Sequence, residues 1–541
     1  MAELADARGL GPRSRKGLEV QILPRAQYNK KTMLRPVVLA ILDGTGLSDD
    51  PNGNAVAQAK KPNLKNFSEN YIGAKLRASG IDVGVPWGEV GSSEVGHTNI
   101  GAGLVIYQNF PRVTLAIQDG SFFKIPVWDE AIKRPNIHIM GLLTISGIHA
   151  HLDHLVGLLQ MLSMKKYKGG VYLHLFTDGE DAPHRSAPKF LKQLQEAMKN
   201  YKIGAIASVS GRYWPMDRSK NWDRVQKFMD VLLEGKGPTA ASMEEVLKNA
   251  YAKEVEDEMI EPTVIVDTKG APIAKMTNKD AAIFFNIRPD RARQLTETLE
   301  KIDGLLTITM TQYEESQKAK VAFPPQFITE PLAKVVSDAG KKQFHIAESE
   351  KYAHVTYFLN GGREAPFKGE DRETIPSPKV SGYEKKPEMA AYEITEEVLK
   401  RLDQDKYEFI VINFANGDMV GHTGNLKAAT KAIETVDECL GTIAKKVLEM
   451  DGVLVITDDH GNCEEMINYQ NKEIDTEHST NPVMLLVVGK QYLSPEAPVI
   501  SEPTGILADV APTVLDIMGI QKPKEMTGQS LLRVIGRIEI L

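Results

Sequence analysis

The chain has 541 residues, more than one hydrophobic core usually serves, so we expect at least two domains. With 42% apolar and 25% charged residues it has the composition of a soluble globular protein, and its net charge of −7 argues against nucleic acid as a partner. Two cysteines provide no disulfide framework, and no apolar run reaches the roughly 18 residues of a membrane span, so we expect a cytoplasmic protein without a membrane partner.

The first 32 residues are basic and contain no uninterrupted apolar region of the kind that a secretory signal requires. This segment is similar to conceptual translations that begin inside an upstream gene. We therefore expect residues 1–32 to be a disordered extension or the product of a start set too early, with Met33 as the initiator.

From Met33 onward, short runs rich in Val and Ile alternate with amphipathic stretches, which is typical of parallel α/β layers. The first run, VVLAIL at 37–42, ends at Asp43. Ligands collect beyond the carboxyl ends of strands in open parallel sheets, so Asp43 is a candidate ligand. A strand-end Asp can also be a helix cap or a turn former.

The stretch GSSEVGHTNIGAG at 91–103 places Ser93 and Glu94 among four glycines, with His97 close by. Glycine permits tight turns and close approach to a ligand, so the Ser93 hydroxyl could be presented as a nucleophile. The alternative for these thirteen residues alone is a surface turn rich in Ser and Gly.

The same alternation continues over residues 108–324, with cationic residues after the strands. Arginine binds phosphate and carboxylate with two parallel hydrogen bonds, so arginines at strand ends indicate a site for a small, multiply charged anion. The alternative is a set of surface ion pairs with Asp217 and Asp290. The arginines are Arg212, Arg218, Arg288 and Arg291; His149 and Asp181 follow other strand runs of the same region, which makes six candidate residues in all.

Pro324 and Pro325 mark a stiff linker after this region. We therefore expect one discontinuous domain, residues 33–107 with 325–541, and a second domain, 108–324, inserted into it. The returning chain carries Lys351 after another apolar run.

Two further strand runs, FIVINF and GVLVIT, are followed by Asp418 and by Asp459 and His460. His422 lies four residues after Asp418 and would share a helical face with it, although such a spacing also occurs in surface pairs. His478 precedes the run PVMLLVV, and its spacing does not fix which sheet edge it reaches. Carboxylates mixed with imidazoles suit a divalent first-row ion such as Mn²⁺, Zn²⁺ or Co²⁺, and the ligands suffice for two ions.

Taken together, these motifs resemble those of the cofactor-independent phosphoglycerate mutases, members of the alkaline phosphatase superfamily. The resemblance runs from Met33 to the end of the chain. The motifs that carry it are LDGTGLS, SSEVGHTNIGAG, GRYWPMDR, NIRPDR, SEKYAHVTYFLNGG, DMVGHTG, DDHGN, TNPV, DVAPTVLDIMG and EMTGQSL.

The resemblance implies an α/β fold of two domains and interconversion of 3- and 2-phosphoglycerate through phosphoserine at Ser93, by a monomer. It implies two metal ions, taken to be Mn²⁺, one held by Asp43, Ser93, Asp459 and His460. Asp418, His422 and His478 would hold the other. Lys351 would contact the transferring phosphoryl group, and the six candidate residues of 108–324 would bind substrate.

One departure from the family concerns the substrate residues. Glu180 stands where the family has an arginine thought to contact substrate. Arg185 could replace the lost cation, or the loop could turn Glu180 outward. Two other functions therefore stay open: a metal-dependent phosphomonoesterase or a mutase for another small phosphorylated acid, and a catalytically silent relative.

Overall fold

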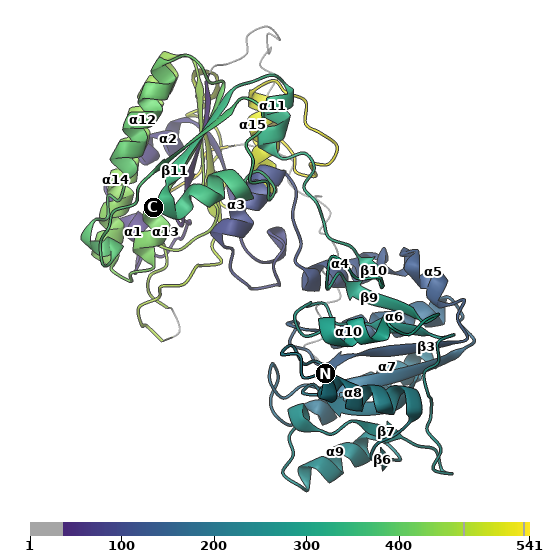
Figure 1. The fold of residues 1–541 in the computed structure, drawn as a ribbon. Helices are drawn as coiled ribbons and strands as arrows, with labels where there is room; N and C mark the ends of the chain where they lie inside the picture. Colours follow the sequence, from purple (N-terminus) through teal and green to yellow (C-terminus); the bar gives the residue numbers. More distant parts are fainter. Residues whose placement is uncertain (1–35, 469–470, 534–535, 541) are drawn as a thin grey trace. The chain divides into compact units, whose positions relative to one another are not determined.

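The computed structural model describes residues 36–468, 471–533 and 536–540, which form two compact units (Figure 1). The discontinuous unit consists of residues 36–108 and 327–540, and the inserted unit of residues 109–326. The expectation for residues 1–32 lies outside the described residues.

An eight-stranded sheet forms the centre of the discontinuous unit. Among these strands β15 runs antiparallel to both of its neighbours, and every other pairing is parallel. The order across the sheet is β12 (Glu370–Ile375), β11 (Gln343–Glu348), β13 (Phe409–Phe414), β1 (Val37–Leu42), β14 (Val453–Thr457), β15 (Val483–Val488), β2 (Ile72–Arg77) and β16 (Gly505–Ile506).

Helices cover both faces of this sheet, which explains why β1 is apolar at every position. Successive side chains of a strand point to opposite faces. Val37, Leu39 and Ile41 pack in the core with α3 (Ser93–Ala102), α11 (Leu332–Asp338) and α15 (Val510–Ile517). The alternate residues of β1 pack on the other face with α2 (Pro62–Asn70), α12 (Ala391–Asp403) and α14 (Leu426–Glu449) (Figure 1).

The inserted unit has its own eight-stranded sheet and its own hydrophobic core. All of its pairings are parallel except that of β5 with β7. The order is β10 (Lys320–Phe323), β9 (Leu306–Thr311), β8 (Ala281–Phe284), β3 (Asn136–Leu143), β4 (Gly170–Thr177), β5 (Ala205–Gly211), β7 (Thr263–Ile265) and β6 (Thr239–Ala240).

The remaining α-helices connect these strands. In the inserted unit they are α4 (Asn109–Asp119), α5 (Val127–Ala131), α6 (Leu152–Met164), α7 (Ala187–Tyr201), α8 (Trp222–Met229), α9 (Met243–Tyr251) and α10 (Arg293–Leu299). In the discontinuous unit they are α1 (Ala55–Gln58) and α13 (Asn416–Gly421). Helices and mainly parallel strands alternate in both units, so the α/β class expected from the sequence is confirmed. None of the helices in the described residues combines the length and apolar character that a membrane crossing needs.

Candidate functional site

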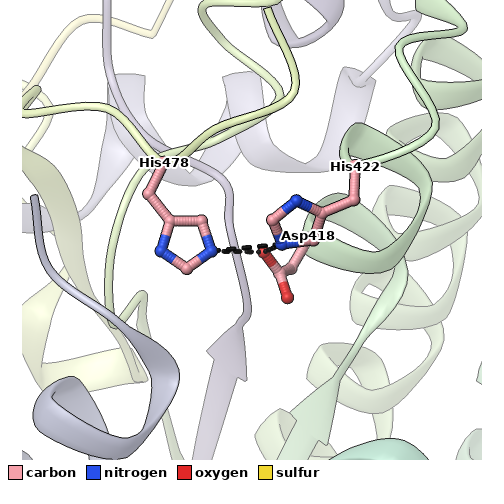
Figure 2. A group of neighbouring side chains, drawn as sticks. All are labelled: Asp418, His422 and His478. Carbon is pink, nitrogen blue, oxygen red and sulfur yellow. Dashed lines mark hydrogen bonds and ion pairs between the residues drawn. The ribbon is translucent and has the colours of Figure 1, made fainter.

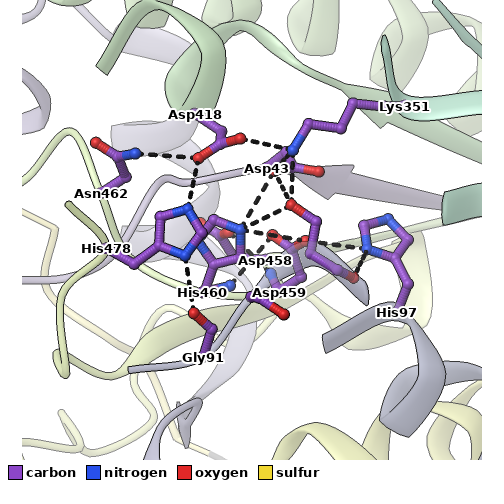
Figure 3. Close-up of polar contacts among 12 residues, drawn as sticks. Asp43, Gly91, His97, Lys351, Asp418, Asp458, Asp459, His460, Asn462 and His478 are labelled. Atoms are coloured by element: carbon purple, nitrogen blue, oxygen red, sulfur yellow. Dashed lines mark hydrogen bonds and ion pairs between the residues drawn. The ribbon is translucent and has the colours of Figure 1, made fainter. Parts of the chain in front are cut away.

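Three adjacent parallel strands of the discontinuous unit bring carboxylates to one edge of its sheet. Asp43 follows β1, Asp418 lies in α13 just after β13, and Asp459 follows β14. All three side chains are buried, and Figure 3 shows that they lie close together. Because β1 lies between β13 and β14, residues that are distant in sequence meet here.

Ser93 is the first residue of α3, and its hydroxyl points into this group of carboxylates. The Ser92 side chain caps the helix by accepting a hydrogen bond from Val95 N at 3.4 Å. Ser93 Oγ donates to Asp43 Oδ1 at 3.1 Å, and it lies 3.0 Å from His460 Nε2. The Lys351 Nζ atom also donates a hydrogen bond to Ser93 Oγ, at 2.6 Å.

Glycines allow the backbone around Ser93 to approach its neighbours closely. A Cβ atom on Gly91 would lie 2.4 Å from the carbonyl oxygen of Ala78, and one on Gly96 would lie 2.6 Å from Asp459 Cβ. Neither position has room for a larger residue, because both contacts are with the main chain or with the base of a side chain. The Ser/Gly stretch is therefore packed against the carboxylate cluster and is not a free surface turn.

A second group of side chains that could hold a metal ion meets at Asp418, where His422 and His478 converge (Figure 2). His422 Nε2 lies 3.1 Å and His478 Nε2 3.2 Å from Asp418 Oδ1, and the two Nε2 atoms are 3.2 Å apart. On the outer side, His422 Nδ1 donates to Thr476 O at 2.7 Å and His478 Nδ1 donates to Gly91 O at 2.8 Å.

These outer hydrogen bonds place the proton of each neutral ring on Nδ1, so both Nε2 lone pairs point inward. Two lone pairs and a carboxylate oxygen at this separation repel one another unless a metal ion or a proton lies among them, and the hydrogen bond with Asp418 accordingly raises the pKa of His422. Two further groups with this capacity occur among the described residues: Asp43 with Asp418 and His460, and Asp43 with His97 and Asp459. The donor set of oxygens and imidazole nitrogens fits a divalent first-row ion.

Burial and charge shift the pKa values of this cluster in opposite directions. Burial raises the pKa of Asp43, but Lys351 and His460 together outweigh that effect and hold the pKa below its usual range. Burial lowers the pKa of Lys351, but the carboxylates of Asp43 and Asp418 raise it above its usual range. Burial also lowers the pKa of His460, but the carboxylates, chiefly those of Asp459 and Asp43, raise it to about 10. The cluster thus holds an excess of negative charge, which favours cation binding.

The inserted unit brings the six candidate substrate residues into one chain of contacts. Arg212 is buried and donates to Asp178 Oδ1 at 2.7 Å and to Asp181 Oδ2 at 2.6 Å. His149 Nε2 lies 3.9 Å from Asp181 Oδ2, and its Nδ1 lies 3.7 Å from Asp290 Oδ1. Asp290 also pairs with Arg218 at 3.2 Å and with Arg288 at 3.1 Å.

Glu180 lies inside this cationic group and does not turn away from it. Its Oε1 atom accepts a hydrogen bond from Arg291 Nη2 at 3.0 Å, and its Oε2 atom lies 3.3 Å from Arg212 Nη2. Arg185 does not replace the missing cation, since it pairs with the exposed Glu254 at 3.0 Å. Asp290 forms ion pairs with Arg218 and Arg288, whereas Asp217 pairs with Arg224, which is not one of the candidate residues.

Sequence reasoning gave no role to four buried residues that support the ligands. Asn462 donates to Asp418 Oδ1 at 3.0 Å, and Glu464 accepts from Gly46 N and Asn462 N at 3.1 and 2.8 Å. His97 and Asn413 contact Asp459 and Asp43. For these four residues the sequence offered one signal, a polar residue inside an apolar strand run, which is Asn413 in FIVINF.

Comparison with known proteins gives consistent matches over nearly the whole chain. The Metalloenzyme superfamily matches residues 35–522. A protein of Clostridium acetobutylicum named 2,3-bisphosphoglycerate-independent phosphoglycerate mutase is 49% identical over 512 residues, 92% of this chain and 99% of that protein. A protein of the same name from Clostridioides difficile is 46% identical over 514 residues, with the same coverage.

A solved structure, the phosphoglycerate mutase of Leishmania mexicana at low cobalt concentration, has a TM-score of 0.51 and 28% identity to this chain. The match covers 92% of this chain and 98% of that structure.

Proposed function

Since the chain belongs to the Metalloenzyme superfamily and, within it, to the 2,3-bisphosphoglycerate-independent phosphoglycerate mutases, we propose that Ser93 carries the phosphoryl group during the interconversion of 3- and 2-phosphoglycerate. This reaction belongs to glycolysis and depends on metal. The observation that supports Ser93 is the placement of its Oγ atom within 3.1 Å of Asp43, His460 and Lys351.

The proposal assigns two divalent ions, Mn²⁺, to the discontinuous unit. Asp43, Ser93, Asp459 and His460 hold one ion, and Asp418, His422 and His478 hold the other. When bound, such ions lower the pKa of a nearby hydroxyl and offset the charge of a phosphate.

The residues of the chain then account for two successive transfers. The Ser93 hydroxyl loses its proton before the first transfer, and Oγ as alkoxide forms a bond to phosphorus as the bond from phosphorus to oxygen 3 of glycerate breaks; Lys351 offsets the negative charge at Oγ. Oxygen 2 of glycerate next forms a bond to phosphorus, and Ser93 Oγ leaves as the alkoxide. In this scheme Asp181 gives a proton to oxygen 3 and receives one from oxygen 2, so its carboxyl group returns to its starting state.

We assign the arginine group of the inserted unit to glycerate binding. The four arginines Arg212, Arg218, Arg288 and Arg291 supply the positive charge that a carboxylate and a phosphate need. His149 lies between Asp181 and Asp290 and lines the same group. Retention of glycerate between the two transfers depends on these contacts.

A phosphomonoesterase is the second candidate, and the position of Glu180 favours it. A carboxylate bound to Arg212 and Arg291 weakens the attraction of these residues for glycerate, and lost glycerate leaves the phosphoserine to water. One assay separates the candidates: purified protein receives 3-phosphoglycerate and Mn²⁺ without 2,3-bisphosphoglycerate, and 2-phosphoglycerate and free phosphate are both followed. Isomer without phosphate supports the mutase, and stoichiometric phosphate release supports the esterase.

We also propose that the protein is a monomer and that it works in the cytoplasm, where glycolysis takes place. Size-exclusion chromatography with light scattering measures the mass of the particle, and the sequence corresponds to 59.8 kDa for a single chain. A particle of twice that mass contradicts the monomer.

A further inference from the structure

Asn413 lies in β13 beside the central strand β1, and its side chain is fully buried. In the parallel register Asn413 is aligned with Ile41, two residues before Asp43, so Asn413 and Asp43 belong to the same face of the sheet. Its Nδ2 atom donates to Asp43 Oδ2 at 2.7 Å and lies 3.1 Å from His97 Nε2.

The carboxylate of Asp43 fixes the orientation of this amide. If the amide were turned over, Oδ1 would face Asp43 Oδ2 and the two oxygens would repel each other. In the observed orientation Oδ1 has no hydrogen-bond partner among the described residues. The amide therefore uses both N–H groups of Nδ2 and leaves its acceptor oxygen unpaired. One N–H group is directed to Asp43 and the other to His97.

His97 is fixed in turn, because Nε2 must accept the hydrogen bond from Asn413. The proton of the neutral ring is therefore on Nδ1, which lies 2.9 Å from Ser93 O and 3.0 Å from Asp459 Oδ2. Asp459 Oδ2 has no hydrogen-bond partner in the described parts of the chain, and Nδ1 of His97 at 3.0 Å and Nε2 of His460 at 3.7 Å are the ring nitrogens beside it. His97 lies one helical turn after Ser93 in α3, so both residues are carried by the same helix.

We propose that Asn413 and His97 form one positioning pair that orients Asp43 and Asp459 for metal binding. Neither residue is a ligand in this arrangement: Asn413 fixes Oδ2 of Asp43, and His97 fixes Oδ2 of Asp459. Oδ1 of Asp43 stays directed toward Ser93 Oγ and Lys351 Nζ. The pair thus links two ligand carboxylates that come from different strands.

This inference rests on the metal ligands assigned in the proposed function, but its test does not require turnover. The test measures Mn²⁺ binding to metal-free protein by electron paramagnetic resonance, since free Mn²⁺ gives a sharp signal that binding suppresses. The titration yields the dissociation constant and the number of ions bound. If the unmodified protein binds Mn²⁺ but does not convert phosphoglycerate, the proposed function is contradicted, and the inference about Asn413 and His97 is unaffected.

Asn413→Leu keeps the size of the side chain and removes both donors, and His97→Phe keeps a ring without nitrogens. Each is expected to weaken Mn²⁺ binding by about 10- to 100-fold, the usual effect of removing a partner of a metal ligand. The double variant is expected to lose little more than the weaker-binding single variant, because both residues act through one network. His97→Asn places an amide N–H near the position of Nδ1 and is expected to recover most of the affinity lost in His97→Phe.

Asn360→Leu is the matched control. Asn360 is also a buried asparagine of the discontinuous unit, and its amide donates to the buried Glu370 carboxylate at 3.0 Å. Its substitution is expected to lower the melting temperature of the metal-free protein while leaving the Mn²⁺ dissociation constant unchanged. Asn413→Gln, which retains an amide, is measured as well in case Asn413→Leu does not fold.

Two results would overturn the inference. An unchanged dissociation constant in folded Asn413 and His97 variants would mean that the pair supports only the fold. Loss of one bound ion in His97→Phe that persists at Mn²⁺ concentrations well above about 100 times the wild-type dissociation constant, while Asn413→Leu still binds both ions, would make His97 a direct ligand and remove its positioning role.

Discussion

Replacing Glu180 by Gln tests whether this carboxylate competes with the substrate for arginine. The change keeps the shape of the side chain and removes its charge. Glu180 contacts Arg291 at 3.0 Å and Arg212 at 3.3 Å, and a phosphorylated acid bound by these arginines must displace it or approach it closely. We therefore expect tighter binding of 3-phosphoglycerate by the Glu180→Gln variant.

The size of the effect follows from the exposure of the two ion pairs. The side chain of Glu180 is 42% exposed, while those of Arg212 and Arg291 are 1% and 20% exposed. Partly exposed pairs contribute about 0.2 to 1 kcal/mol each, and the burial of Arg212 places this site in the upper part of that range. Two such pairs amount to about 1 to 2 kcal/mol, which corresponds to roughly a 5- to 30-fold decrease in KM.

Initial rates with 3-phosphoglycerate, followed by a coupled assay for 2-phosphoglycerate, measure this effect. kcat is expected to change little, because the repulsion acts on the bound substrate and on the transition state alike. Glu130→Gln is the matched control, since Glu130 is 44% exposed and pairs with Lys320 within the same unit, outside the arginine group. A KM for Glu180→Gln equal to that of the control would refute the competition.

Three further predictions concern the nucleophile, the metal and acid stability. Ser93→Ala is expected to bind Mn²⁺ but to form no 2-phosphoglycerate, and appreciable turnover would remove Ser93 from its role. Chelation is expected to abolish activity and lower the melting temperature, since ligands that bind only the folded state stabilise it, and added Mn²⁺ should restore both. Burial lowers the pKa of His154 to about 3, whereas the unfolded chain titrates near 6.5. The unfolded state therefore takes up the proton first, so the free energy of unfolding falls as the pH decreases from about 6.5 toward about 3. Chemical unfolding measured across this range should show that this free energy depends less on pH in His154→Leu.

The sequence predicted the α/β class because the strands that precede the candidate ligands are buried on both faces. Such strands appear as uninterrupted apolar runs, and VVLAIL at β1 is the clearest case. The positions of Asp43, Asp418 and Asp459 followed from the same pattern, since each residue lies within four residues of the end of a run. Their metal-binding roles, the substrate roles in the inserted unit and the domain limits stay predictions.

Side-chain direction within loops was beyond the reach of sequence patterns. Glu180 could have faced outward, but the structure directs it toward Arg212 and Arg291. Asn413 and His97 received no role, because a hydrogen-bonded pair formed between a strand and a helix leaves no regular spacing in the sequence. Contacts between residues far apart in the chain become visible only once the sheet order is known.

The central place of β1 has a consequence for biosynthesis. Both strands that flank it, β13 and β14, follow residue 408, so during translation β1 emerges long before either neighbour exists. The strands of the inserted unit all lie between residues 136 and 323 and can pair while the ribosome is still working. In the nascent chain the six apolar residues of β1 have no sheet to join, which makes this segment a candidate for chaperone protection until the last third of the polypeptide has been made.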